Sequence, residues 1–368
     1  MNIPFFDYRR QLRTIDKEVN SAIKRVLHSG QLILGNEGKM FEDDFAKYIG
    51  SKYAIGVNSG TDAIKIALKA IDIKPHDEII TVANTAVPTI SAIRECGAIP
   101  KFVDIKPDFN INENKIEQTI TQKTKAILPV HLFGNPCNIS VISKIAKKYQ
   151  IKIIEDCAQA HGATYRGKKV GGFGDLGCFS FYPTKNLGAY GDAGMITTSN
   201  KQLAEKCFQL RMYGMKKRNY SIREGYNSRL DEIQAAILNV KLKYLDQWND
   251  RRSQIAKFYL NKIKNPYIVL PATNDIKSHA FHLFVIRVKQ REHFLKYLNE
   301  NEIGYGIHYP YPIFMQKAYS FLNYKNSNLS FTCRFSKEIV SIPLFPELKN
   351  GEIKYIIEKL NKYKLKEK

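Results

Sequence analysis

Residues 151–159 have the sequence Ile151-Lys152-Ile153-Ile154-Glu155-Asp156-Cys157-Ala158-Gln159, an apolar run that leads into two acids. Such a run is typical of a buried β-strand, and it places Asp156 at the carboxyl end of that strand. Open α/β sheets bind their ligands at this end. We therefore expect a sheet with a ligand site beside Asp156.

The same pattern recurs along the first half of the chain. Further strand-like runs lie at residues 53–57, 78–82, 101–105, 126–130, 176–181 and 193–198. Segments with helical periodicity lie between them, at about 88–95, 112–120 and 138–149. Strands that alternate with helices favour a mostly parallel sheet in an α/β domain.

Helical patterns flank this region on both sides. Two helices are predicted at about 14–28 and 37–49, and a long one at about 229–262. The pattern beyond the long helix is that of a smaller α+β piece, with a strand at 281–288 and helices at about 290–300 and 351–364. We predict a large domain over residues 1–245 and a small C-terminal domain over residues 246–368.

The composition excludes some classes of protein and leaves others open. Apolar residues make up 44% of the 368 residues, as in an ordinary soluble protein. No apolar run approaches the roughly 18 residues that span a bilayer, and the N-terminus lacks a basic stretch followed by an apolar one. We expect a cytoplasmic protein with no membrane partner. The six cysteines are scattered without metal-ligand spacing, so we expect neither disulfides nor a metal.

The net charge of +22 could indicate a nucleic-acid binder. The lysines are spread along the whole chain, however, which favours a solvated surface over a nucleic-acid site. We therefore expect no nucleic-acid partner. A basic surface would still attract a small anionic substrate, such as a nucleotide diphosphate.

One loop has the context of a phosphate site. Asn58-Ser59-Gly60-Thr61-Asp62 follows a strand and opens an amphipathic helix, so Gly60 and Thr61 lie where free N–H groups and the helix dipole suit a phosphate. A plain N-cap by Ser59 or Thr61 is the alternative. The run 172–177 also matches G-x-G-x-x-G, but a strand follows it instead of a helix, so we interpret it as a turn.

A lysine follows another strand. In Cys178-Phe179-Ser180-Phe181-Tyr182-Pro183-Thr184-Lys185 a strand ends in a turn that carries Lys185. A lysine held in such a turn can form a Schiff base, because desolvation lowers its pKa and frees the amine. Asp156 could pair with a protonated pyridine nitrogen. Alone, Asp156 could equally be a capping carboxylate and Lys185 a surface group.

Together, the three segments form the protein half of a pyridoxal-phosphate (PLP) site, in the order that a fold-type I PLP enzyme uses. The chain then closely resembles the DegT/DnrJ/EryC1/StrS family of sugar-nucleotide aminotransferases. The motifs that carry the resemblance are Gly35, Phe41-Glu42, 58–63, 129–134, 155–162, 180–185, 226–236 and 307–310. The resemblance implies an aspartate-aminotransferase-like fold, with a large, mostly parallel-sheet domain and a smaller α+β domain.

The resemblance also implies roles for individual residues. Lys185 would hold PLP covalently, Asp156 would pair with the ring nitrogen, and Gln159 would lie near the ring hydroxyl. The phosphate would be held by Gly60, Thr61 and Ser180. Asn227 would reach the phosphate in the other subunit, which makes the active unit a homodimer. His308 would lie near the sugar.

The chain departs from many relatives at three positions. Ala86 stands where an aromatic residue often packs near the cofactor ring, Phe314 stands at the place of a second histidine, and Asn135 replaces a common glutamine. These changes leave open which residue stacks on the ring, and they bear on the shape of the substrate. None of them affects Lys185 or Asp156.

Residues 82–88 and 228–232 are similar to those of relatives that aminate C3 of a dTDP-3-keto-6-deoxyhexose. We therefore expect transfer of the amino group of L-glutamate to C3 of that sugar, in the biosynthesis of a surface glycan or lipopolysaccharide. The alternative enzyme is a C4 aminotransferase acting on a UDP- or dTDP-4-keto sugar. A non-catalytic PLP or sugar-nucleotide sensor is an alternative of another class, which Lys185 and Asp156 together disfavour.

Overall fold

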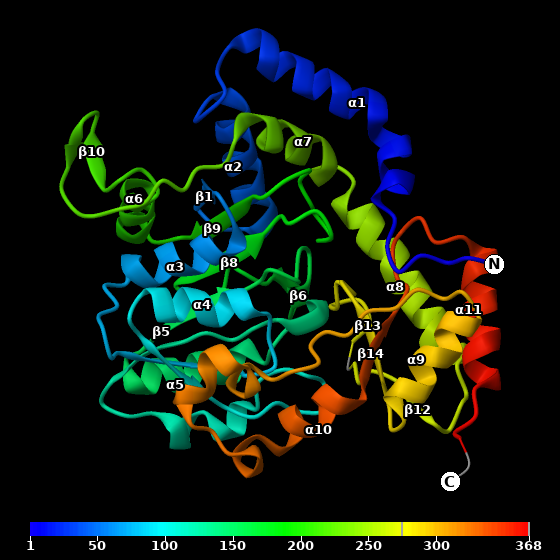
Figure 1. Cartoon of the computed structure of the whole chain (residues 1–368). Helices are drawn as coiled ribbons and strands as arrows, with labels where there is room; N and C mark the ends of the chain where they lie inside the picture. The colour runs from blue at the N-terminus through cyan, green and yellow to red at the C-terminus, as the bar shows by residue number, and fades with distance from the viewer. Residues whose placement is uncertain (274, 367–368) are drawn as a thin grey trace.

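The computed structural model describes residues 1–273 and 275–366. Its centre is a seven-stranded sheet (Figure 1). In sheet order the strands are β1 (Tyr53–Val57), β9 (Gly194–Thr198), β8 (Leu176–Ser180), β5 (Lys152–Asp156), β4 (Thr124–Ile127), β2 (Glu78–Thr81) and β3 (Ile99–Phe102). The pairs from β8 to β3 are parallel, whereas β9 runs antiparallel to both of its neighbours. The expected α/β class with a mostly parallel sheet is confirmed.

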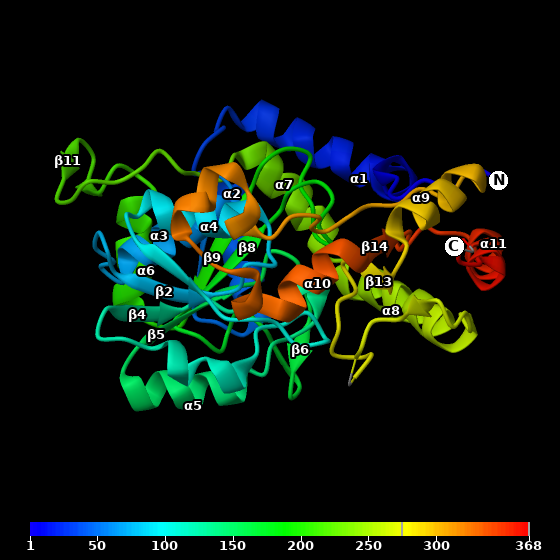
Figure 2. The same cartoon turned by 60° about the horizontal axis from the view of Figure 1, so that its bottom comes forward.

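Helices cover both faces of this sheet. The helices of this part of the chain are α1 (Tyr8–Ser29), α2 (Asn36–Ile49), α3 (Gly60–Ala70), α4 (Val87–Glu95), α5 (Ile139–Tyr149), α6 (Lys201–Leu210) and α7 (Glu232–Leu242), and α1 packs on α7. Helix α3 contacts α4, α6 and the strands β8 and β9, while α5 lies on the opposite side of the sheet (Figure 2). The strands are buried almost throughout, so their near-continuous apolar sequences are those of a sheet covered on both faces.

The C-terminal part contains a three-stranded antiparallel sheet. Its elements are α8 (Leu245–Lys262), β12 (Ile268–Val269), β13 (Phe284–Val288), α9 (Arg291–Glu300), α10 (Ser330–Glu338), β14 (Ile339–Ile342) and α11 (Asn350–Lys362). Two small hairpins complete the chain, β6–β7 (Thr164–Tyr165 and Lys168–Lys169) and β10–β11 (Met215–Lys217 and Tyr220–Ser221). The β10–β11 hairpin extends away from the body in both views (Figures 1 and 2). No helix among the described residues has both the length and the apolar character needed to cross a bilayer.

Two segments link the halves of the molecule across residue 245. Ile3 bonds to Glu302 and Gly304 and lies in the C-terminal core, so the first residues pack with the small domain. The segment around Ile313 and Phe314 packs in the core of the large domain, where Ile313 N–H donates to Ala83 O at 3.0 Å. We retain the division into 1–245 and 246–368 as a proposal, with these two segments crossing it.

Two of the predicted helices are wrong. Residues 229–262 form two helices, α7 and α8, because α7 packs between α1 and α2 whereas α8 packs with the C-terminal core, and one straight helix could not serve both. Residues 112–120 form only two short 3-10 turns, Glu113–Lys115 and Glu117–Thr119. The Asn112 side chain caps the first of these turns by accepting from Asn114 N–H, and the chain returns to an extended conformation at Ile120.

Candidate active site

A cavity of about 280 Å³ opens at the carboxyl ends of β5 and β8. The predicted residues that line it are Gly60, Thr61, Asp156, Gln159, Ser180 and Lys185. The strands β5 and β8 are parallel neighbours, so Asp156 and Ser180 emerge at the same edge of the sheet. Residues that are far apart in sequence are thereby gathered into one site.

The phosphate loop has the geometry that its sequence predicted. Ser59 caps α3, accepting from Asp62 N–H at 3.1 Å, while the N–H groups of Gly60 and Thr61 have no hydrogen-bond partner in the described chain. The N-cap and phosphate interpretations are therefore compatible. A Cβ at position 60 would lie 2.6 Å from the Cβ of Ser180, so only glycine lets the start of α3 approach the end of β8.

Lys185 lies in the expected tight turn. Its N–H donates to Tyr182 O at 2.8 Å, and a Cβ at Gly188 would lie 2.5 Å from Pro183 O, so the turn requires a glycine there. Burial lowers the pKa of Lys185 to about 8, although the Asp156 carboxylate opposes this shift. Its Nζ has no hydrogen-bond or ion-pair partner among the described residues. At neutral pH an appreciable fraction of this amine is therefore unprotonated and able to attack a carbonyl carbon.

The Asp156 carboxylate is almost completely buried. Its Oδ1 accepts from Ala158 N–H at 3.1 Å, and its Oδ2 accepts from the Thr89 hydroxyl at 2.9 Å. Burial raises the pKa of Asp156, and these two bonds, together with the charge of Lys185, act in the opposite direction. A positive charge brought into the cavity would stabilise the ionised form further.

Gln159 is held at both ends of its amide. Its Oε1 accepts from Phe133 N–H at 2.7 Å, and its Nε2 donates to the Tyr309 hydroxyl at 2.9 Å. No local pattern in the sequence indicates this role of Tyr309. Thr89 was also missed, although its spacing of four residues from Thr85 at a helix start could have shown that both hydroxyls share a face.

The other two predicted residues do not line this cavity. His308 is bonded through Nδ1 to Ser341 Oγ at 2.9 Å and stacks on Phe5. Burial lowers the pKa of His308 to about 4, and the charge of Lys185 adds to the shift, so the ring is neutral at pH 7. Asn227 is exposed near the base of the β10–β11 hairpin and does not line the cavity of its own chain. Of the departures from the family, Ala86 does line the cavity.

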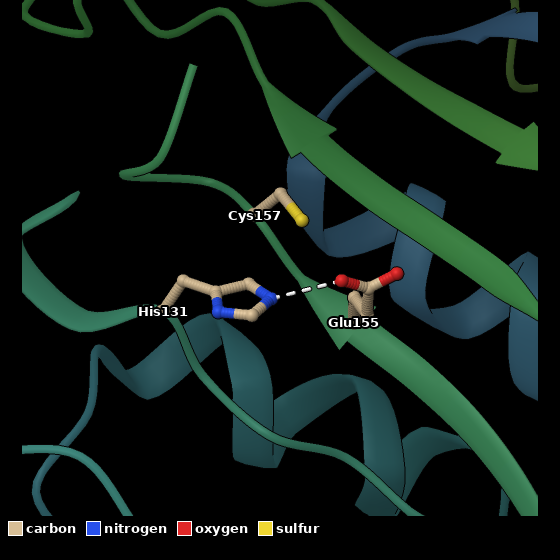
Figure 3. A group of neighbouring side chains, drawn as sticks. All are labelled: His131, Glu155 and Cys157. Carbon is tan, nitrogen blue, oxygen red and sulfur yellow. Dashed lines mark hydrogen bonds and ion pairs between the residues drawn. The ribbon is translucent and has the colours of Figure 1, made fainter. Parts of the chain in front are cut away.

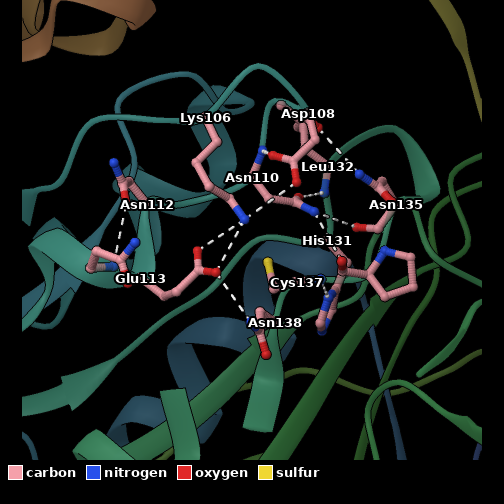
Figure 4. Close-up of polar contacts among 12 residues, drawn as sticks. Lys106, Asp108, Asn110, Asn112, Glu113, His131, Leu132, Asn135, Cys137 and Asn138 are labelled. Atoms are coloured by element: carbon pink, nitrogen blue, oxygen red, sulfur yellow. Dashed lines mark hydrogen bonds and ion pairs between the residues drawn. The ribbon is translucent and has the colours of Figure 1, made fainter. Parts of the chain in front are cut away.

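A polar network holds the loop that supports Gln159 (Figure 4). Asn110 Nδ2 donates to the carbonyl oxygens of Asn135 and Pro136 at 3.1 and 3.0 Å, and its Oδ1 accepts from Leu132 N–H at 3.4 Å. Beside it the Lys106 ammonium forms ion pairs with Glu113 at 3.0 Å and with Asp108 at 3.4 Å. These bonds fix residues 131–136, and hence the N–H of Phe133 that orients Gln159.

Beneath the site lies a buried cluster of His131, Glu155 and Cys157 whose composition resembles a metal site (Figure 3). Cys137 N–H donates to His131 Nδ1 at 3.0 Å, so the proton is on Nε2 and is donated to Glu155 at 3.0 Å. Burial raises the pKa of the Cys157 thiol well above its usual value, so the sulfur is protonated. Both histidine nitrogens are engaged and no thiolate is present, so the cluster is satisfied without a metal.

Glu155 instead fastens the turn that precedes β8. It accepts from the N–H groups of Gly171, Phe173 and Gly174 at 2.9, 2.8 and 2.7 Å. Burial alone would raise the pKa of Glu155, but the bond to His131 and the backbone donors more than offset it, so that the pKa lies below its usual value. A depressed pKa means that the stabilisation is complete above the unfolded pKa and is lost as the pH falls through the folded one.

Replacing Glu155 by glutamine should therefore lower the free energy of unfolding at pH 7 by roughly 2–4 kcal/mol, because a buried charge-assisted network is broken. The variant should also lose less stability than the wild type when the pH is lowered through this range. Denaturant unfolding at a series of pH values measures both effects, with the exposed Glu205→Gln as the control. Equal unfolding curves for wild type and Glu155→Gln would contradict this role.

Known proteins resemble this chain over nearly its whole length. The model of the DegT/DnrJ/EryC1/StrS aminotransferase family matches residues 13–361. A dTDP-3-amino-3,6-dideoxy-alpha-D-galactopyranose transaminase of Aneurinibacillus thermoaerophilus is 49% identical over 98% of this chain and 99% of that protein. A dTDP-3-amino-3,4,6-trideoxy-alpha-D-glucose transaminase of Streptomyces venezuelae is 37% identical over 98% of this chain and 96% of that protein.

The fold agrees equally well with a solved structure. The X-ray structure of S. venezuelae DesV in complex with a ketimine intermediate matches with a TM-score of 0.96 at 37% identity, covering 98% of each chain. The cavity also suits PLP, since it offers an unpartnered lysine amine, a buried carboxylate and the free N–H groups of a helix start. The chain belongs to the DegT/DnrJ/EryC1/StrS aminotransferase family and is a PLP-dependent aminotransferase.

Proposed function

We propose that the protein transfers the amino group of L-glutamate to C3 of a dTDP-3-keto-6-deoxyhexose, giving a dTDP-3-amino-3,6-dideoxyhexose. The observation that carries the proposal is the cavity itself, in which a lysine amine with a lowered pKa lies with a buried carboxylate and the free N–H groups of a helix start. Bound PLP would supply an electron sink for the charge that develops at the substrate carbon. The remaining chemistry belongs to residues of the chain.

Each residue of the cavity receives one task in this proposal. The N–H groups of Gly60 and Thr61 and the hydroxyl of Ser180 hold the phosphate. Asp156 accepts a hydrogen bond from the protonated nitrogen of the ring, and Gln159 lies beside the ring hydroxyl. Lys185 would hold the cofactor between reactions. Once released, its amine moves a proton between the substrate carbon and C4′ of the cofactor.

The choice of C3 is supported by residues 82–88 and 228–232 and by the names of two relatives, both of which are transaminases of dTDP-3-amino sugars. Amination at C4 of a UDP- or dTDP-4-keto sugar is the alternative. We also propose that His308 lies near the sugar, that the reaction takes place in the cytoplasm, and that the product serves a surface glycan or lipopolysaccharide.

We further propose that the active unit is a homodimer in which Asn227 reaches the cofactor phosphate of the other subunit. Asn227 is exposed and does not line the cavity of its own chain, which supports a role in the site of a second subunit. Exposed apolar side chains lie near the α1–α2 connection and on the hairpin, at Leu32, Ile33, Leu34, Tyr220 and Ile222. Large apolar side chains exposed in this way are available for contact with a second subunit.

The position of amination can be tested in a half-reaction. The PLP-loaded protein is converted to its pyridoxamine form with L-glutamate, the glutamate is removed, and a keto sugar is added. We expect the absorbance of the PLP form to return rapidly with a dTDP-3-keto-6-deoxy sugar, generated in place by a ketoisomerase, and not with its 4-keto isomer. Return with the 4-keto isomer alone would overturn C3 and keep the class. No response to glutamate would favour the non-catalytic sensor.

A further inference from the structure

Two threonines, Thr85 and Thr89, stand in line behind the Asp156 carboxylate, and all three residues line the cavity. Thr89 lies in the first turn of α4, and its hydroxyl donates to Asp156 Oδ2 at 2.9 Å. The hydroxyl of Thr85 lies 3.0 Å from that of Thr89. Both threonines are only 2% exposed, so water does not compete freely for these hydroxyls.

The direction of these two hydrogen bonds follows from counting protons. An ionised carboxylate can only accept, so the single hydroxyl proton of Thr89 points at Asp156. Thr89 then has no proton left for Thr85, and Thr85 must be the donor in the bond between them. The chain Thr85 to Thr89 to Asp156 is thus polarised in one direction, and each bond strengthens the next.

The same count shows what remains free on Asp156. Its Oδ1 is engaged by Ala158 N–H and its Oδ2 by Thr89, which fixes the rotation of the carboxylate. Each carboxylate oxygen can accept more than one bond, so acceptor capacity is left on the side of the cavity. Lys185 and His131 lower the pKa of this carboxylate. Tyr309, Cys157 and Cys178 also interact with it, and burial raises the pKa of each of these three groups, so that they face the carboxylate uncharged. Lys185 is committed to the cofactor in the proposed function, and His131 is bonded to Cys137 and Glu155.

We propose that Thr85 and Thr89 are positioning residues that hold Asp156 ionised and rotated so that it receives the N–H of the PLP ring. This inference rests on the role proposed for Asp156. Asp156 thus does not act alone. A neutral pair of hydroxyls at the start of α4 compensates for its burial. Without such help, a buried carboxylate would take up a proton and lose its attraction for a pyridinium nitrogen.

The test compares isosteric variants. Thr89→Val removes the hydroxyl and keeps the volume, Thr89→Ser keeps the hydroxyl, and Thr85→Val removes only the outer donor. Thr197→Val is the matched control, because Thr197 is fully buried and its hydroxyl donates to Gly171 O, away from Asp156. For each folded variant, the dissociation constant of PLP is measured by titrating the apo protein, and the absorbance of the bound cofactor is followed against pH.

A hydrogen bond to a charged group contributes about 1.5–3 kcal/mol, so Thr89→Val should weaken PLP binding by about 10- to 100-fold. The pH midpoint of the cofactor absorbance reports the pKa of the nitrogen that joins PLP to Lys185. This midpoint should move upward, because a ring that is less often protonated withdraws less electron density from that nitrogen. Thr85→Val should give a smaller change of the same sign. Thr89→Ser should restore most of both values, and Thr197→Val should change neither.

Three outcomes would overturn the inference. In the first, Thr89→Val matches Thr197→Val in PLP affinity and in pH midpoint. In the second, Thr89→Ser binds PLP as weakly as Thr89→Val, which would make altered packing the cause of the loss. If Thr89→Val does not fold, a Thr85→Val variant with the PLP affinity and pH midpoint of the wild type would also overturn the inference. Hydride reduction followed by peptide mass analysis separates this from the proposed function: PLP on Lys185 of the wild type leaves that function intact whatever Thr89 does, whereas an unlabelled Lys185 would remove both.

Discussion

Lys185→Ala should reduce transamination by about 10³-fold or more, because the variant loses both the nucleophile that holds the cofactor and the base that moves the proton. Among the described residues, no other lysine lines the cavity to replace it. Steady-state rates with L-glutamate and the keto sugar measure the loss. The control is Lys152→Ala, which removes an exposed lysine paired with Asp175 and should retain nearly full activity. Activity of Lys185→Ala within tenfold of the wild type would contradict the role of Lys185.

The same variant tests the homodimer. If Asn227 serves the site of the other subunit, Asn227→Ala should be impaired, and mixing it with Lys185→Ala after unfolding and refolding should restore activity. A hybrid dimer would contain one site with the intact Lys185 of one chain and the intact Asn227 of the other. Mixtures no more active than the sum of their separate components would contradict the shared site.

Asp156→Asn should have the second largest effect. The asparagine keeps the shape of the side chain and loses the charge, which leaves the ring nitrogen without its partner in a buried site. Removal of one member of a buried ion pair costs about 3–5 kcal/mol, so we expect a loss of roughly 10²- to 10³-fold in kcat and weaker binding of PLP. The exposed Asp246→Asn, whose carboxylate bonds to Tyr48 and Lys169, is the control.

The outcome for Asp156→Asn also separates two kinds of failure. A lower kcat with Lys185 still labelled by hydride reduction would place the defect at the ring nitrogen, as we expect. A folded variant with wild-type kcat and PLP affinity would contradict the role of Asp156. It would also deprive Thr85 and Thr89 of the role inferred for them, because they contact the cofactor only through this carboxylate in that inference.

The sequence alone determined where the three main parts of the site lie. Gly60 and Thr61 follow β1, Asp156 ends β5, and Lys185 follows β8. Each of these positions is set by a local rule, that a buried apolar run forms a strand and that a polar or glycine-containing turn follows it. Parallel neighbours such as β5 and β8 end at the same edge, so local patterns were sufficient to predict that these residues meet.

The supporting residues could not be found in this way. Tyr309 reaches Gln159 from 150 residues away along a segment that crosses between the two domains. The long helix expected at 229–262 is likewise broken because its two ends pack against different cores. Hydrophobic periodicity records which face of an element is buried and does not record what it is buried against. The sequence therefore determined the fold class and the positions of Lys185 and Asp156 at the ends of strands. Only tertiary packing decided which side chains hold these two residues in place.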